Sequence, residues 1–143
     1  MKHMLLLAAI ALIGLVSSCK KEATSEELLI GKWQASQAFI GTNNALVTTG
    51  TSRTELQIEF KEGNALAFTW QNYNLTTNPP VLIESTLNGT YSWNGDNISI
   101  TVVSGSDTRT VTGTMEVSET HFLFTGTSGD IDDFISLLEA DKI

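Results

Sequence analysis

Histidine and cysteine, which supply catalytic bases, thiol nucleophiles and transition-metal ligands, are scarce in this chain of 143 residues. It has one cysteine, Cys19, and two histidines, His3 and His121. A structural zinc ion usually takes four Cys or His ligands, and nucleophilic catalysis needs a base beside a Ser, Thr or Cys. His121 begins an expected strand, on its outward face. The sequence therefore predicts no metal site, no cofactor and no catalytic residue.

The carboxylates are numerous, but their positions do not indicate catalysis. Glu55, Glu59 and Glu84 fall on outward faces of expected strands, whereas an acid–base pair of carboxylates must converge in a cleft. The chain contains 16 acidic and 8 basic residues, which gives a net charge of −8. Nucleic-acid binding needs a clustered basic surface. We therefore expect no nucleic-acid partner.

An aspartate-rich segment, residues 130–133, begins the C-terminal part of the chain. Four apolar residues recur there at the spacing i, i+3, i+4 and i+7: Ile131, Phe134, Ile135 and Leu138. This spacing predicts an α-helix from about 130 to 141, with the aspartates at its positive N-terminal end. A calcium loop is the alternative, but its Gly and distal Glu are not at the required positions.

The N-terminus has the pattern of a signal peptide, residues 1–18. Lys2 precedes an uncharged apolar run from Leu5 to Val16, and Ser17 and Ser18 follow as small residues. Such a run spans roughly 18 Å as a helix, less than the ~30 Å hydrocarbon core of a bilayer. The segment is therefore expected to direct export and then to be removed.

The residues around the cleavage zone, Val16-Ser17-Ser18-Cys19, resemble the lipobox of bacterial lipoproteins. The resemblance implies cleavage before Cys19, whose thiol and new amino group would receive acyl chains and attach the protein to a membrane. Lys20 in place of Asp implies the outer membrane, and 20–22 resembles surface-export tags of Bacteroidetes lipoproteins. We therefore expect an outer-membrane lipoprotein, on the periplasmic face or the cell surface, with residues 19–27 as a polar tether. An ordinary secretory signal followed by an unrelated cysteine is the alternative.

Residues 28–143 form the predicted domain, in which polar and apolar residues alternate with the period of a β-strand. Leu56, Ile58 and Phe60, for example, alternate with polar neighbours. Short turns such as 94–96 connect successive strands, which predicts an antiparallel meander. About eight such strands would leave two free edges, and closure into an up-and-down barrel removes them. A two-sheet sandwich is the second choice.

Two glycines and two loops add detail to the barrel. Gly89 and Gly113 fall at inward positions, where a missing side chain permits close approach of another strand. Residues 41–53 and 74–80 interrupt the strands and are predicted to be rim loops. The aromatic residues assigned to the interior are candidate ligand contacts: Trp33, Phe39, Phe60, Phe68, Trp70, Tyr91, Trp93, Phe122 and Phe124.

The entry to the domain, Leu28-Leu29-Ile30-Gly31-Lys32-Trp33-Gln34, resembles the Gly-x-Trp entry of lipocalins, and the lipocalin-like lipoproteins of Bacteroidetes most closely. The resemblance implies a lipocalin-like barrel in which Trp33 closes the base. We expect non-catalytic binding of a small hydrophobic ligand in the interior. The alternative is a packed barrel that recognises a protein or glycan partner through the loops 41–53 and 74–80.

Overall fold

The computed structural model describes residues 24–143, so the predicted signal peptide, residues 1–18, and Cys19 lie outside the described residues. The elements are α2 (Ser25–Leu29), β1 (Gly31–Ile40), β2 (Asn43–Asn44), β3 (Ser52–Lys61), β4 (Ala65–Asn74), β5 (Val81–Asn94), β6 (Asn97–Ser104), β7 (Asp107–Val117), β8 (His121–Gly129) and β9 (Ile135–Lys142). A short 3₁₀ turn, Glu62–Asn64, joins β3 to β4.

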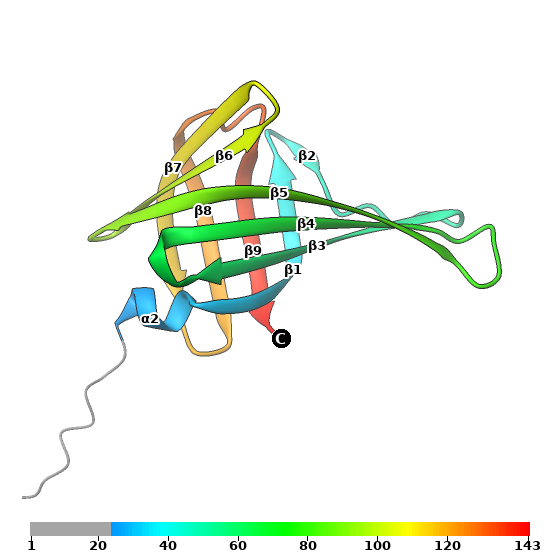
Figure 1. The fold of residues 1–143 in the computed structure, drawn as a ribbon, viewed down its shortest axis with the longest axis horizontal. Helices are drawn as coiled ribbons and strands as arrows, with labels where there is room; N and C mark the ends of the chain where they lie inside the picture. The colour runs from blue at the N-terminus through cyan, green and yellow to red at the C-terminus, as the bar shows by residue number, and fades with distance from the viewer. Residues whose placement is uncertain (1–23) are drawn as a thin grey trace, which may run out of the picture.

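The strands form a closed antiparallel barrel (Figure 1). Successive strands from β3 to β9 pair with one another, and β1 pairs with both β3 and β9. Eight strands therefore enclose the core, while the two-residue β2 is an additional strand beside β1. The predicted all-β, up-and-down barrel is confirmed.

The predicted C-terminal helix, about 130–141, is wrong, because Ile135–Lys142 form strand β9. β9 pairs with β1 and β8 and so closes the barrel. Opposite Phe39 and Ile40 the register of β9 skips Ser136, which is bulged out of the ladder. The bulge puts Ile135 and Leu138, three residues apart, on the same buried face. A bulged strand thus reproduced the spacing of a helix.

Close approach of neighbouring strands explains the two inward glycines. A Cβ atom at Gly89 would lie 2.2 Å from the carbonyl oxygen of Thr101, and one at Gly113 would lie 2.1 Å from that of Thr125. Real Cβ atoms do not approach backbone oxygen so closely. Glycine is therefore required at both positions for the barrel wall to coil as it does.

A short helix precedes the barrel and overlaps the end of the range predicted as a polar tether, 19–27. α2 begins at Ser25, and Thr24 caps it: Glu27 N–H donates to Thr24 Oγ1, and Thr24 N–H donates to a Glu27 carboxylate oxygen. This reciprocal pair is a capping box. Among the described residues, no helix has the length and apolar character needed to cross a membrane.

The ends of three strands project beyond the barrel (Figure 1). Ser52 pairs with Asn74, and Asn74 pairs with Val81, so the start of β3, the end of β4 and the start of β5 form one small sheet. We call residues 47–54 and 71–83 the arm. In Figure 1 the arm and α2 lie at opposite ends of the molecule.

Candidate functional site

The middle of the barrel is filled by most of the aromatic residues that the sequence assigned to the interior. Tyr91 is 3% exposed, and five others are at most 1% exposed: Trp33, Phe60, Phe68, Phe122 and Phe124. Phe122 meets both Trp33 and Phe60 edge to face, with ring centroids 5.1 and 5.8 Å apart. Such contacts are typical of a packed core. These rings therefore occupy the space in which a lumen ligand was expected.

Three of the predicted interior aromatics lie elsewhere than in this packed centre. Trp70 and Trp93 are half-buried and pack against the edge of the core. Phe39 is also half-buried but lies on the outer face, opposite Leu137 of β9. The cause is a bulge at Ser36, after which Ala38 is the residue that faces the core. Phe39 as an interior contact is therefore wrong.

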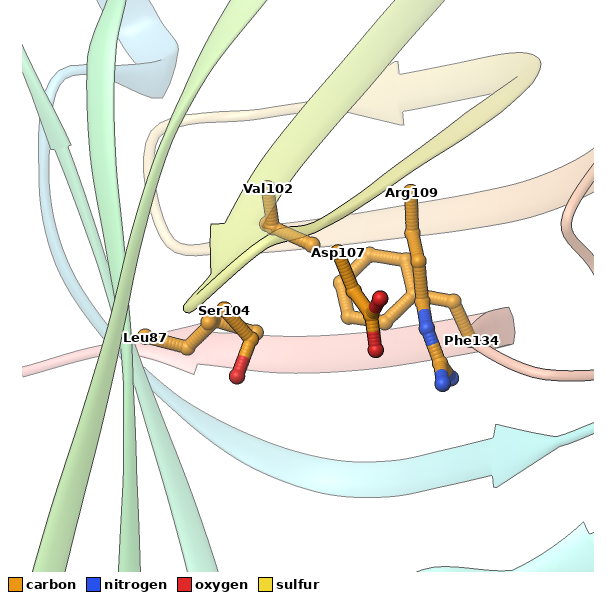
Figure 2. A pocket seen from close by; sticks show the side chains of 6 residues that line it. All are labelled: Leu87, Val102, Ser104, Asp107, Arg109 and Phe134. Atoms are coloured by element: carbon orange, nitrogen blue, oxygen red, sulfur yellow. The ribbon is translucent and has the colours of Figure 1, made fainter.

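A pocket opens at the end of the barrel where β5 and β6 separate (Figure 2). We call it the mouth pocket, and its volume is about 190 Å³. Three strands and the turn before β9 contribute its lining: Leu87, Val102, Ser104, Asp107, Arg109 and Phe134. This volume corresponds to roughly six water molecules at about 30 Å³ each, which is smaller than a typical drug-sized site.

Phe134 forms the inner wall of the mouth pocket. Its side chain is 6% exposed, and its ring meets Phe68 edge to face at 5.5 Å. A tight turn positions it: the N–H of Phe134 donates to the carbonyl of Asp130 at 2.8 Å, and the Asp130 carboxylate accepts from the N–H of Thr110 at 2.7 Å. Asp130 therefore fixes a turn against β7, and Phe134 closes this end of the core.

Arg109 and Asp107 provide the charges of the mouth pocket. They are two residues apart on β7, so their side chains lie on the same face, and Figure 2 shows both extending in the same direction beside the Phe134 ring. The guanidinium Nη1 of Arg109 donates to the carbonyl oxygen of Asp133. Because a guanidinium has five N–H donors, others stay available for an anionic group.

The second half of the predicted rim loop 41–53 meets the other predicted rim loop, 74–80, on the arm, whereas Asn43 and Asn44 pair with β1. The N–H of Leu75 donates to the carbonyl of Thr51 at 2.9 Å, and the guanidinium of Arg53 lies over the ring of Tyr73, 4.5 Å from its centroid. A shallow surface hollow runs between Thr51 and Ile83. The arm is thus a second candidate for recognition, separate from the mouth pocket.

His121 has two carboxylate neighbours on the barrel surface. Its Nδ1 lies 3.0 Å from Asp141, and its Nε2 lies 3.4 Å from Glu139. Within residues 24–143, no three His, Cys, Asp or Glu side chains are grouped so that they could hold a metal ion. This pair of contacts links the start of β8 to β9 across the ladder.

Sequence reasoning missed most of the mouth pocket. Leu87 and Val102 follow the strand alternation and read as ordinary core residues, while Phe134 was assigned to a helix. The one available signal was Arg109, a charged residue at an inward-facing end of a strand. Comparison of the chain with family models, curated proteins and solved structures gave no match.

Proposed function

We propose that this protein is a lipid-anchored, lipocalin-like binding protein of the bacterial outer membrane that holds a small hydrophobic ligand at the mouth of its barrel, without catalysis. The supporting observation is the mouth pocket, which combines apolar walls with a guanidinium at its rim. The lipobox at residues 16–19 supports the membrane anchor, and the closed barrel supports the likeness to lipocalins.

The lining of the pocket defines the ligand. Leu87, Val102 and Phe134 offer apolar contacts, and the free N–H groups of Arg109 suit a carboxylate. Asp107 on the same rim reduces the net positive charge, so apolar contact must supply most of the binding free energy. We therefore expect a short aliphatic or aromatic acid, or the carboxyl end of a longer chain.

Calorimetric titration with linear carboxylic acids, from butanoic to decanoic, tests this ligand class. Leu87→Trp fills the pocket and should abolish binding, while Leu82→Trp makes the same change on the arm and should leave it intact. Arg109→Gln should weaken binding of the acids more than that of the matching alcohols. Absence of binding to the unmodified protein, or normal binding by Leu87→Trp, would contradict the proposal.

The anchor has its own test. Cys19→Ala should release the protein from membranes and abolish its labelling by radioactive or clickable fatty acid, because stable attachment needs the acyl chains. Lys21→Ala keeps the cysteine and should remain attached. Membrane attachment of Cys19→Ala at the level of the unmodified protein would exclude lipidation as the anchor.

A further inference from the structure

One edge of β5 has no partner strand over its first half. β5 pairs with β4 from Val81 to Thr90, but its pairing with β6 begins only at Gly89. No other described strand pairs with β5. Residues 81–88 are thus held on one side only, and they include part of the arm.

The polar groups of this free edge can be assigned from the hairpin that follows. Asn94 and Asn97 flank a two-residue turn and form a hydrogen-bonded pair. Since no register shift occurs in β5, its even-numbered residues direct their N–H and C=O groups to the β6 side. Leu82, Glu84 and Thr86 therefore present unpaired backbone groups along the free edge.

Aliphatic side chains accompany these groups on both faces of the sheet. Val81, Leu82 and Ile83 are 49%, 42% and 62% exposed. Because successive side chains of a strand alternate, the three residues occupy both faces. A lipid surface would bury the side chains but leave the backbone N–H and C=O groups without hydrogen bonds. Another strand would bury the side chains and also form those hydrogen bonds. The edge therefore fits an extended polypeptide.

Charge indicates which polypeptide it is. The chain has a net charge of −8, yet the arm and the free edge 81–88 together contain only two charged residues, Arg53 and Glu84. Two copies repel each other over most of their surfaces but can approach along this edge, where Glu84 is the one carboxylate of each copy. A second copy also presents the same free edge, as a closed two-fold dimer requires.

We infer that β5 is a dimerisation edge, which pairs antiparallel with β5 of a second copy and joins the two arms into one six-stranded sheet. Glu84 lies within the edge and selects the register. A two-fold axis at Glu84 would place two carboxylates directly opposite each other, which is destabilising. An axis at Ile83 or at Ser85, the two neighbouring positions, avoids this opposition and keeps the exposed residues Val81–Ile83 within the contact, and this is the register that we infer.

The size of the contact determines its strength. Only residues 81–88 of β5 are free on each copy, whereas a standard interface uses roughly 20–30 residues a side. The dimer is consequently weak and concentration-dependent. Concentration on a membrane surface would favour it. The inference does not depend on ligand binding at the mouth pocket.

Disulfide trapping tests the edge directly, in a chain with Cys19→Ala so that each variant has one thiol. At the axis, non-hydrogen-bonded residues of two antiparallel strands have Cα atoms about 4.5 Å apart, within disulfide range. Ile83→Cys or Ser85→Cys should give a covalent dimer under mild oxidation. Val103→Cys is the matched control, because Val103 is 53% exposed but lies on β6 and not on the free edge of β5. This variant should stay monomeric.

Sedimentation of the Cys19→Ala chain provides the second test. Its average mass should rise with concentration towards twice the monomer mass, and Thr86→Pro should hold it at the monomer mass. Proline there removes a donor that faces the free edge and costs no bond of the existing ladder. Thr86→Pro should still bind ligand at the mouth pocket, so loss of the dimer and loss of that function are distinguishable. A concentration-independent monomer, with trapping at Ile83 and Ser85 no better than at Val103, would overturn the inference.

Discussion

The indole Nε1 of Trp33 donates a 2.7 Å hydrogen bond to the carbonyl oxygen of Leu29 at the end of α2. Lys142 of β9 lies 5.0 Å from the Trp33 ring centroid and donates to the carbonyl of Leu28 at 3.0 Å. The last carbonyls of a helix lack partners within the helix. β1 and β9 thus supply those partners and fix α2 to the barrel.

Trp33→Phe should therefore cost about 2–3 kcal/mol of the free energy of unfolding, since it leaves the Leu29 carbonyl unpaired and opens a small cavity. Denaturant titration measures the loss. Trp93→Phe is a matched control, because Trp93 is half-buried and its Nε1 bonds to Gly95 in an exposed turn. An equal loss of unfolding free energy in both variants would show that the hydrogen bond of Trp33 contributes no more to stability than that of Trp93.

Gly113→Ala should destabilise the barrel by about 3 kcal/mol, at the upper end of the usual range for overpacking. The new methyl group would meet both the Thr125 carbonyl and the Phe124 ring, at 2.1 and 2.8 Å. Gly50→Ala is the control, because no atom lies within 4 Å of a Cβ there. Thermal unfolding should separate the two variants clearly, and similar melting temperatures would refute the close approach of β7 and β8.

Much of the barrel was predictable because strand alternation is local. Leu56, Ile58 and Phe60 were assigned to the interior of β3 from their spacing, and all three are buried. Bulges are different, because they arise where two strands pair with unequal numbers of residues. The bulge at Ser36 moved Phe39 to the outer face, and the sequence of β1 alone contains no sign of it.

The mouth pocket and the arm were less predictable, because they too depend on how strands pair. The mouth pocket exists because β5 and β6 are paired only between Gly89 and Val102 and the turn that joins the two strands, and because Phe134 turns inward before β9. Neither the separation of the strands nor the turn at Phe134 can be predicted from the alternation of polar and apolar residues. The two rim loops were recognised as interruptions, but their meeting on one arm depends on the unusual length of β5.

The stability of the barrel should fall above pH 10 because of Tyr91. Burial, with a smaller contribution from the charge of Glu26, raises the pKa of the Tyr91 phenol above its usual 10.0. Below pH 10 the phenol is neutral in both the folded and unfolded chains. As the pH rises past 10, the unfolded chain ionises first, so the free energy of unfolding decreases until the folded phenol also ionises.

Denaturant titration at pH 9 and pH 11, compared between the unmodified protein and Tyr91→Phe, measures this contribution. The variant should lose less stability over the interval, because it has no buried phenol to ionise. Tyr73→Phe, which changes the half-buried tyrosine of the arm, should behave like the unmodified protein. A steeper decrease in Tyr91→Phe would reverse the expected sign.

Phe134→Ala should convert the mouth pocket into a deeper cavity that continues towards Phe68. The ring separates the pocket from the packed centre, and its removal should cost about 3–5 kcal/mol, as for other buried phenylalanines. The same change should allow longer carboxylic acids to bind, because their chains can enter the space that the ring vacates. Calorimetry should then show tighter binding of decanoic than of hexanoic acid in the variant, by at least tenfold. Ile131→Ala, in the same turn but outside the pocket lining, should leave the chain-length preference unchanged. If Phe134→Ala folds and its preference also stays unchanged, the ring does not set the depth of the site.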